Sequence, residues 1–365
     1  MRIELNQKNL KRALSLVERV ASRSVTLPIL SNVILKTEAG RLKIEATNLE
    51  IGITCVIGAK IEEPGEIAVP ARIISDFIAN LNEENLSLHT KQNNLFITTK
   101  NHKTQILGFN TKEYPIIPKI KDGPTCQVAG IALRTALLSV VDSIALSEAR
   151  PELSGLYIRF TQKEILCAAT DSFRLVEKKL TTPCVKMGSV IIPRNTVTEL
   201  IRILGDLDGN VEIRIGENQI SFSNGDVELI SRLIDGTYPD YTKVIPEKTL
   251  SKILTSREEL EQHTKLASLF SSTISDITFQ CGEDGLTVLS RNSDRGELQA
   301  HLDGILKGDP FSLSVNYHYL LDGLKVIKSE KIILEFTGAG SPLVLRPAEE
   351  QEQKTFLYLL MPLRN

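Results

Sequence analysis

One arrangement of apolar and polar residues occurs three times along the chain. In each copy, apolar side chains at positions i, i+3, i+4 and i+7 mark one face of a helix. The copies begin at residues 74, 197 and 320, so they are spaced by 123 residues. The three faces are Ile74, Phe77, Ile78 and Leu81; Val197, Leu200, Ile201 and Leu204; and Leu320, Gly323, Leu324 and Ile327.

Other elements follow the same repeat. An amphipathic helix is predicted on Leu10, Ala13, Leu14 and Val17; on Leu133, Ala136, Leu137 and Val140; and on Leu260, His263, Ala267 and Phe270. The third of these helices starts with a capping box from Ser256 to Glu259. Alternation of period two predicts half-buried strands at Leu42, Ile44 and Ala46; at Ile165, Cys167 and Ala169; and at Leu286, Val288 and Ser290.

The repeat predicts three domains of one kind. Leu and Ile are common, so one matching pattern could arise by chance. Chance does not explain why two helices and a strand all recur at the same spacing of about 123 residues. Pro- and Gly-containing stretches near 115–124 and 244–250 place the domains at 1–122, 123–248 and 249–365. Helices followed by alternating strands indicate an α+β fold in which helices pack on antiparallel sheets.

Composition narrows the class of protein. The chain has 365 residues, 42% of them hydrophobic, and a formal net charge of −2. Its N-terminus lacks the apolar segment of a secretion signal, and no stretch approaches the ~20 apolar residues of a membrane span. Five cysteines without CxxC spacing indicate neither a disulfide framework nor a zinc site. These features favour a cytoplasmic protein with reduced thiols.

Motifs of catalysis and cofactor binding are absent from the sequence. It contains no phosphate-cradling glycine loop, no GxSxG and no HExxH, and its five histidines are scattered over the copies. Asp171 could be pictured as an acid or base, but Asn48 occupies the same place in the first copy, and turns favour both residues. We therefore predict no catalytic residue, no metal and no cofactor.

Positive charge gathers on the predicted helices, and acidic residues gather in the hairpins. Lys8, Lys11, Arg12 and Arg19 lie on the polar side of the first helix. Such segregation is what a nearly neutral protein needs in order to contact DNA phosphates without reading sequence. A solvated helix face of mixed charge is the alternative interpretation, and the pattern alone leaves it open.

Several motifs together resemble one family. They are Thr26-Leu27-Pro28-Ile29-Leu30-Ser31-Asn32-Val33, Ala46-Thr47-Asn48-Leu49-Glu50, Val69-Pro70-Ala71-Arg72, Ala169-Thr170-Asp171 with Arg174-Leu175, Tyr238-Pro239-Asp240-Tyr241 and the end Leu360-Met361-Pro362-Leu363-Arg364. In this order, and over the whole chain, the sequence resembles the bacterial DNA sliding clamps, the beta subunits of DNA polymerase III.

The resemblance implies a fold and a function. It implies a head-to-tail homodimer of three clamp domains per protomer, with helices lining a ring interior and antiparallel sheets outside. It implies a non-catalytic processivity factor that encircles duplex DNA without sequence preference. The implied partners are the DNA polymerase III alpha subunit, the clamp loader and other proteins that carry a clamp-binding peptide motif.

The resemblance also implies site residues. The peptide pocket would be walled by Arg150, Leu153, Thr170, Arg174, Leu175, Pro239, Val244, Leu343, Leu360, Met361, Pro362 and Leu363. DNA contacts would come from Arg23, Ser24, Arg72, Arg194, Asn316 and Tyr319. The dimer seam would place Thr104 and Ile106 of a first-domain strand against Leu269 and Phe270 of a third-domain helix.

Some positions depart from the family pattern. Ser172-Phe173 stands where many members have Gly and His, and Pro342 stands where Ser is usual. Pro151-Glu152 replaces two DNA-contacting aromatic residues, and Ser24 replaces a basic one. We therefore expect a narrower pocket on the side of Phe173 and a hold on DNA that is geometric first and electrostatic second.

Two other classes of function compete with the clamp. A structural or carbohydrate-binding repeat scaffold would share the triplication but would need neither basic helices nor a ring. An enzyme built on Asp171 and its neighbours would lose its activity when Asp171 is replaced by Asn.

Overall fold

The structure is a computed structural model that describes residues 1–21, 27–147 and 149–363. Seven α-helices occur in these ranges. They are α1 (Gln7–Val17), α2 (Ala71–Ala79), α3 (Gly130–Val140), α4 (Arg194–Ile203), α5 (Arg257–Ser268), α6 (Tyr317–Val326) and α7 (Glu350–Gln353). The first six coincide with the predicted apolar faces, which confirms the helical part of the repeat, whereas the short α7 was not predicted.

Local side chains determine where several helices begin. Asn6 Oδ1 accepts the N–H of Lys8 at 3.0 Å to start α1, and Asn316 Oδ1 accepts that of His318 at 2.9 Å to start α6. Ser256 Oγ accepts the Glu259 N–H at 3.3 Å, as the capping box predicts. Phe270 was placed on α5 by the sequence pattern, and this was wrong because the helix ends at Ser268.

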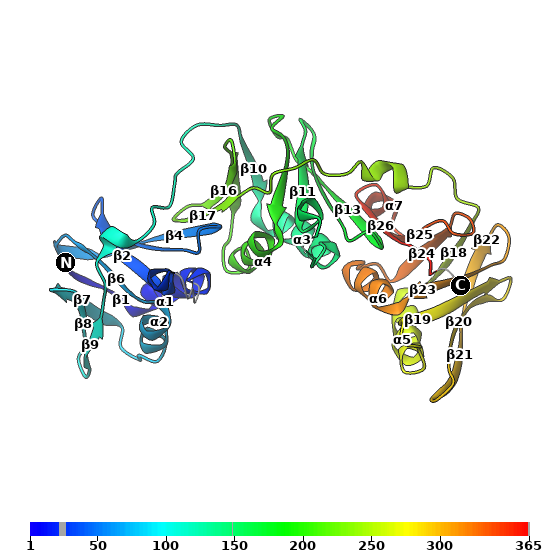
Figure 1. The fold of residues 1–365 in the computed structure, drawn as a ribbon, viewed down its shortest axis with the longest axis horizontal. Helices are drawn as coiled ribbons and strands as arrows, with labels where there is room; N and C mark the ends of the chain where they lie inside the picture. The colour runs from blue at the N-terminus through cyan, green and yellow to red at the C-terminus, as the bar shows by residue number, and fades with distance from the viewer. Residues whose placement is uncertain (22–26, 148, 364–365) are drawn as a thin grey trace. The chain divides into compact units, whose positions relative to one another are not determined.

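The chain forms two compact units, and the first comprises residues 1–131 and 202–233. Its five-stranded sheet has the order β5 (Lys60–Glu63), β1 (Arg2–Asn6), β7 (Asn85–Lys91), β8 (Asn94–Thr98) and β9 (Lys103–Leu107). Its eight-stranded sheet has the order β10 (Thr125–Ala129), β15 (Asn210–Ile215), β16 (Gln219–Asn224), β17 (Val227–Arg232), β4 (Ile51–Gly58), β3 (Arg41–Thr47), β2 (Asn32–Glu38) and β6 (Glu66–Pro70). Helices α1 and α2 lie side by side in this unit, and α1 packs on β4 (Figure 1).

The second unit comprises residues 132–201 and 234–365. Its nine-stranded sheet has the order β14 (Gly188–Pro193), β11 (Gly155–Phe160), β12 (Glu164–Thr170), β13 (Arg174–Thr181), β26 (Phe356–Leu360), β25 (Leu343–Pro347), β24 (Lys331–Phe336), β18 (Ser251–Ser256) and β22 (Gly304–Lys307). Its four-stranded sheet has the order β21 (Gly296–Leu302), β20 (Gly285–Asn292), β19 (Asp276–Gly282) and β23 (Phe311–Asn316). Helices α5 and α6 pack against each other.

Strand pairing between the sequence repeats explains why three repeats give two units. Strand β17 of the second repeat pairs with β4 of the first, and β13 of the second repeat pairs with β26 of the third. The second repeat is therefore divided between two continuous sheets. The pairs that build these sheets are antiparallel, as the period-two pattern predicts.

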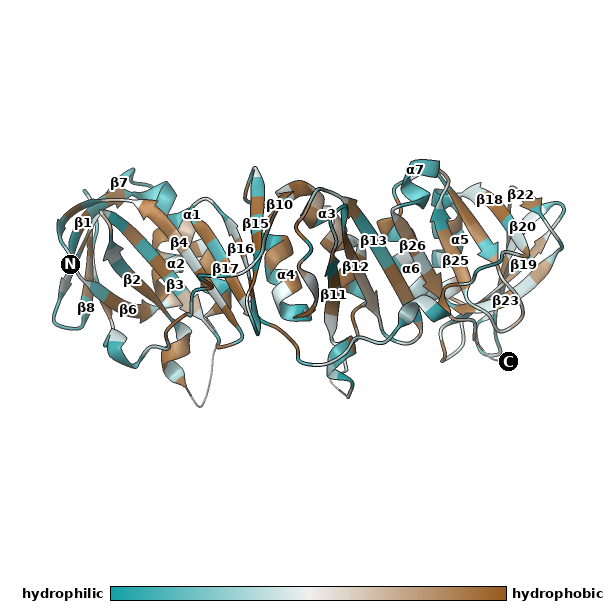
Figure 2. Ribbon diagram, turned by 90° about the horizontal axis from the view of Figure 1, so that it is seen from above, coloured by the Kyte–Doolittle hydropathy of each residue, from teal (hydrophilic) through white to brown (hydrophobic). Residues whose placement is uncertain are grey.

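The core follows the predicted alternation. Leu42, Ile44 and Ala46 on β3 are completely buried, and so are Cys167 and Ala169 on β12. Apolar stretches run along these strands in both units (Figure 2). The apolar surface buried by such faces is the main stabilising contribution to each unit.

The cysteines differ in part from the expectation. Cys55, Cys167 and Cys281 are buried free thiols. Burial raises the pKa of the Cys167 thiol to about 12, so it stays protonated at neutral pH. Cys126 and Cys184 are disulfide-bonded, so the prediction of reduced thiols was wrong for these two residues.

Gly323 on α6 allows a close approach of the C-terminal strand. A methyl group added at Gly323 would lie 2.8 Å from Cε1 of the buried Tyr358 ring. We expect Gly323→Ala to lower the free energy of unfolding by about 1–2 kcal/mol, because overpacking outweighs the better helix propensity of Ala. Urea unfolding measures this, with Gly282→Ala as the control, since an added methyl there meets nothing within 4 Å. Equal stability of the two variants would contradict the packing argument.

Candidate functional site

A cavity of about 170 Å³ lies within the second unit, at the ends of β12, β13 and β26. It is bordered by residues 239–244, which lie near the end of the second repeat. Its walls are Arg150, Leu153, Thr170, Ser172, Arg174, Leu175, Pro239, Asp240, Tyr241, Val244, Leu359 and Met361. Apolar side chains dominate, with a few polar groups that can orient a ligand.

The structure brings together most of the residues expected at the peptide pocket. Eight of the twelve line this cavity: Arg150, Leu153, Thr170, Arg174, Leu175, Pro239, Val244 and Met361. Leu343 and Leu360 are completely buried and do not line it, nor do Pro362 and Leu363.

Three cavity residues were missed by sequence reasoning: Asp240, Tyr241 and Leu359. Ser172 was expected beside the pocket together with Phe173, and of these two only Ser172 lines the cavity. Asp240 and Tyr241 belong to the same motif as Pro239, so their position beside it was a usable signal. Alternation along β26 puts Leu359 and Met361 on one face and Leu360 on the other. The sequence-based prediction took the consecutive residues Leu360 to Leu363, whereas an extended strand directs only every second side chain towards the cavity.

A tight turn after β12 shapes one wall of the cavity. Asp171 Oδ1 accepts the N–H groups of Phe173 and Arg174 at 3.0 Å each, and Thr170 Oγ1 donates to the Arg174 carbonyl at 2.6 Å. Ser172 between them has a positive φ of 78°. The Asp171 carboxylate is thus engaged in turn chemistry, as Asx residues commonly are.

Arg174 connects the cavity wall to helix α6. Its side chain is only 10% exposed; Nε donates to Asp171 Oδ2 at 2.9 Å, and Nη1 donates to Asp322 on α6. Nη2 donates to the Asp142 carbonyl, and the guanidinium carbon lies 4.6 Å from the Tyr319 ring centroid. Burial lowers the pKa of Arg174, but the interactions of the guanidinium with Tyr358, Asp322 and Asp171 raise the pKa by more than burial lowers it. The pKa is therefore above its usual value, and the group stays charged.

Aromatic residues form an apolar layer beside the cavity. Tyr157 stacks on Tyr238 with ring centroids 4.9 Å apart, and Tyr241 contacts both rings edge-on. The Tyr241 hydroxyl donates to Glu177 Oε2 at 2.7 Å. Burial and this acceptor raise the pKa of Tyr241, so it remains a neutral donor. Each ring of this layer thus packs against the other two.

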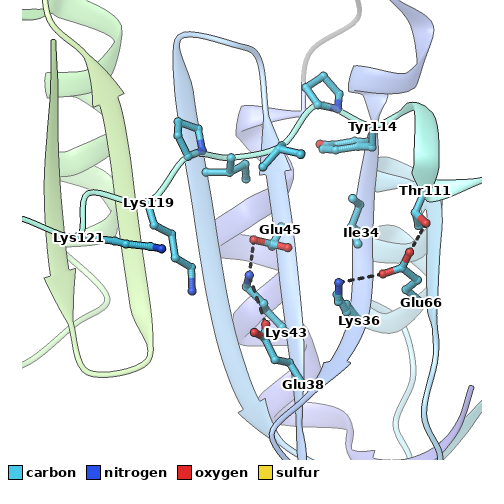
Figure 3. A pocket seen from close by; sticks show the side chains of 14 residues that line it. Ile34, Lys36, Glu38, Lys43, Glu45, Glu66, Thr111, Tyr114, Lys119 and Lys121 are labelled. Atoms are coloured by element: carbon cyan, nitrogen blue, oxygen red, sulfur yellow. Dashed lines mark hydrogen bonds and ion pairs between the residues drawn. The ribbon is translucent and has the colours of Figure 1, made fainter. Parts of the chain in front are cut away.

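A second cavity, of about 460 Å³, lies in the first unit and has different chemistry. The segment 114–121 passes over β2 and β3, whose outer face carries charged side chains (Figure 3). Lys43 Nζ lies 2.7 Å from Glu45 Oε1, and Lys36 pairs with Glu66 at 3.1 Å. These ions largely neutralise one another, and the apolar part of this cavity comes from Ile34 and from the segment 114–121, which includes Ile116 and Ile117.

The residues expected to contact DNA are in different environments. Arg72 on α2 is 73% exposed and makes only a 3.6 Å contact with Asp76. Arg194 instead donates to the carbonyls of Val141 and Ile144 at 2.8 Å each. Tyr319 is half-buried under Arg174 and Phe173. Asn316 caps α6 through His318, while Arg23 and Ser24 lie outside the described residues.

The residues expected at the dimer seam lie on an edge strand of the first unit and directly after a helix of the second unit. Thr104 and Ile106 are on β9, an edge strand, and Ile106 is buried in the first unit. Leu269 follows α5 and is 61% exposed, whereas Phe270 is half-buried. Leu269 thus presents the apolar surface that a seam needs.

Side chains that could bind a metal ion do not gather anywhere in the part of the chain that the structure describes. Residues 1–21, 27–147 and 149–363 contain no group of three His, Cys, Asp or Glu side chains that could hold a metal ion. None of the helices in these ranges is long and apolar enough to span a membrane.

Comparison with known proteins identifies the family. Models of the N-terminal, central and C-terminal domains of the DNA polymerase III beta subunit match residues 1–118, 127–240 and 242–364. The beta sliding clamp of Bacillus subtilis is 28% identical over the whole length of both chains.

Solved structures agree with this match. The crystal structure of the DNA polymerase sliding clamp from Bacillus subtilis has a TM-score of 0.94 at 28% identity, covering 100% of this chain and 99% of that one. A sliding clamp of Pseudomonas aeruginosa bound to griselimycin has a TM-score of 0.95 at 26% identity, with both chains fully covered. The chain therefore belongs to the DNA polymerase III beta subunit family and has its three-domain clamp fold: it is a sliding clamp, a non-catalytic processivity factor of DNA replication.

Proposed function

We propose that two copies of this chain close into a head-to-tail ring around duplex DNA. The observation that carries the proposal is a missing strand pair. In the three repeats, β9, β17 and β26 occupy one corresponding position, and β4, β13 and β21 occupy another. Strand β17 pairs with β4, and β26 pairs with β13, so two of the three possible pairs are formed within the chain. Strands β9 and β21 are both sheet edges. An unpaired edge is a template for another strand, so the third pair forms between protomers.

The two observed pairs also predict the register of the third. Leu229 lies opposite Ile53, and Tyr358 lies opposite Val176. Following the pairings through each repeat, Thr104 corresponds to Leu229 and Tyr358, and Leu298 corresponds to Ile53 and Val176. The seam therefore places Thr104 of one protomer opposite Leu298 of the other.

Exposed apolar residues beside these strands support the same seam. Ile73 on α2 is 56% exposed, whereas its counterpart on α4, Thr196, is completely buried. Leu269 offers a similar apolar side chain next to β21. Burying such groups supplies the non-directional part of an association energy.

Enclosure makes tight DNA contacts unnecessary. The exposed Arg72, together with the basic residues of α1, would meet phosphates without reading bases. Domains at 1–122, 123–248 and 249–365, and a cytoplasmic location beside the replicating DNA, are parts of this proposal. Retention on circular but not linear DNA tests it.

We also infer that the 170 Å³ cavity of the second unit is the docking pocket for short peptides. The peptides would come from the DNA polymerase III alpha subunit, the clamp loader and other replication and repair proteins. The apolar wall of Leu153, Leu175, Leu359 and Met361 suits hydrophobic anchors, and Arg150 at the rim suits an acidic residue. The griselimycin complex of the Pseudomonas aeruginosa relative agrees with a clamp that binds peptide-like ligands.

Met361→Ala tests the pocket. We expect about a tenfold loss in affinity for a fluorescent polymerase peptide, or about 1.4 kcal/mol, because an apolar anchor contact is removed. Fluorescence anisotropy measures the affinity, and Met187→Ala, outside the cavity, is the matched control. The dimer should stay intact in both variants; dissociation of the Met361→Ala dimer would show that the pocket is misplaced.

A further inference from the structure

The turn that shapes the peptide pocket has a counterpart in the first unit. Asn48 Oδ1 accepts the N–H groups of Glu50 and Ile51 at 3.0 and 2.7 Å, as Asp171 does for the residues 123 positions later. Thr47 Oγ1 donates to the Ile51 carbonyl, matching the bond from Thr170 to Arg174. Leu49 and Ser172 share the same positive φ of 78°. The local geometry of the pocket is therefore built twice.

Each residue that lines the pocket has a corresponding residue in the first unit. The strand pairings and the shared Tyr-Pro motif give the correspondence. The shift of 123 matches Leu27, Leu30, Thr47, Leu49, Ile51 and Gly52 to Arg150, Leu153, Thr170, Ser172, Arg174 and Leu175. The Tyr-Pro motif matches Pro115, Ile116, Ile117 and Ile120 to Pro239, Asp240, Tyr241 and Val244. The strand pairings match Ile230 and Arg232 to Leu359 and Met361. The first unit thus contains a second version of the site.

The deep part of this second version is already filled. Gly52 stands where the pocket has Leu175, and Ile117, from the segment near the end of the first repeat, lies against it. A methyl group added at Gly52 would be 2.6 Å from Ile117 Cγ2. The chain therefore supplies its own apolar anchor here. The start of the segment is fixed by Tyr114, whose hydroxyl donates to the Asn32 carbonyl and accepts the Thr47 N–H.

The rim of the second version is apolar where the rim of the pocket is polar. Leu27, Leu49 and Ile116 replace Arg150, Ser172 and Asp240, and they are 42%, 45% and 92% exposed. Three large apolar side chains brought to one rim are unusual on a protein surface unless they bind something. Lys119 and Lys121 follow on the same segment with their side chains exposed (Figure 3).

We propose that this rim is a second docking surface of the protomer, and that its ligand is an extended partner peptide with leucine-like side chains and acidic residues. The leucines would lie on Leu27, Leu49 and Ile116, and the acidic residues would face Lys119 and Lys121. Ile117 occupies the deep anchor position, so the peptide binds more weakly here than in the pocket. The inference rests on the proposed peptide pocket through the correspondence of the two sites.

Methyl NMR of the full chain with labelled Ile and Leu tests the proposal. The probe is a synthetic octapeptide of four leucines, two aspartates and two serines. We expect the methyl signals of Leu49 and Ile116 to shift along a weaker binding curve than those of Leu153 and Leu359. The double variant Leu49→Ser, Ile116→Asp carries the residues found at the corresponding positions of the pocket. It should abolish the shifts of Leu27 and Ile117 and leave the Leu359 curve unchanged.

The controls separate the two sites. Val185→Ser removes an apolar side chain that is 59% exposed elsewhere and should change neither curve. Ile117→Ala should open the deep position and tighten the weaker curve several-fold. The proposal of a second docking surface would be overturned if the signals of Leu49 and Ile116 stayed unchanged while the binding curve of Leu153 and Leu359 reached saturation. Absence of both curves would count against the peptide pocket as well.

Discussion

The protein is expected to stay on a nicked circular plasmid after loading and to be lost once the plasmid is linearised. A closed ring can leave DNA only by opening or by sliding off an end, so linearisation removes the barrier to escape. Contacts with phosphates weaken steeply as salt rises, whereas enclosure does not depend on them. The circle should therefore retain the protein at salt concentrations that abolish ordinary electrostatic binding. Co-elution with DNA in gel filtration measures retention.

A seam variant provides the control for this experiment. Leu269→Asp places a charge on a side chain that is 61% exposed in the free protomer, so the fold should tolerate it while the seam should not. We expect monomers that are retained on neither form of DNA. Ile274→Asp, at a residue 59% exposed in the same repeat, should behave as the unaltered chain. Equal retention of the unaltered chain on circular and linear DNA would refute topological holding.

Replacement of Arg174 by Ala is expected to have the largest effect on stability. The side chain is 10% exposed and meets the carboxylates of Asp171 and Asp322, which would lose their partner. Removing one member of a buried ion pair costs about 3–5 kcal/mol, because the remaining charge stays desolvated. This holds for Asp171, which is 16% exposed, whereas Asp322 is 36% exposed and solvent would screen its charge. Urea unfolding of the full chain measures the change.

The same variant should also lose the peptide pocket. The Arg174 side chain donates from Nε to Asp171 Oδ2, and the other oxygen of that carboxylate accepts the N–H groups of the turn beside Ser172, so the cavity wall would relax without the guanidinium. Arg72→Ala is the matched control, since its guanidinium is exposed and should contribute less than about 0.5 kcal/mol to stability. If Arg174→Ala were as stable as Arg72→Ala, the ion-pair network would not be what joins the turn to α6.

Local patterns in the chain were sufficient to predict the elements of the fold. Apolar periodicity depends only on which face of a helix or strand meets the core, and this is written in neighbouring residues. The three-fold repeat, the helices on Ile74 and Val197, and the alternation around Ile44 were read in this way. Asp171 could be assigned to a turn because Asx side chains bond to backbone groups two or three residues away.

Part of the candidate site could not be predicted in this way. Leu360 was expected at the pocket and Leu359 was not, because alternation does not tell which of the two faces of β26 meets the cavity. The pairing of β26 with β13 decides it. The ion pair of Arg174 with Asp322 joins residues 148 positions apart, and the contact of Ile117 with Gly52 depends on the course of a connecting segment.

The sequence by itself determined the repeated unit, its α+β class and the absence of catalytic motifs, because these follow from local patterns and residue types. Only the tertiary structure decided how the repeats join. Strand edges pair through backbone N–H and C=O groups, which every residue carries, so the pairing of β17 with β4 leaves no signature in side-chain order. For the same reason, only the structure shows that β9 and β21, unlike their counterparts in the other repeats, are sheet edges on which a ring could close.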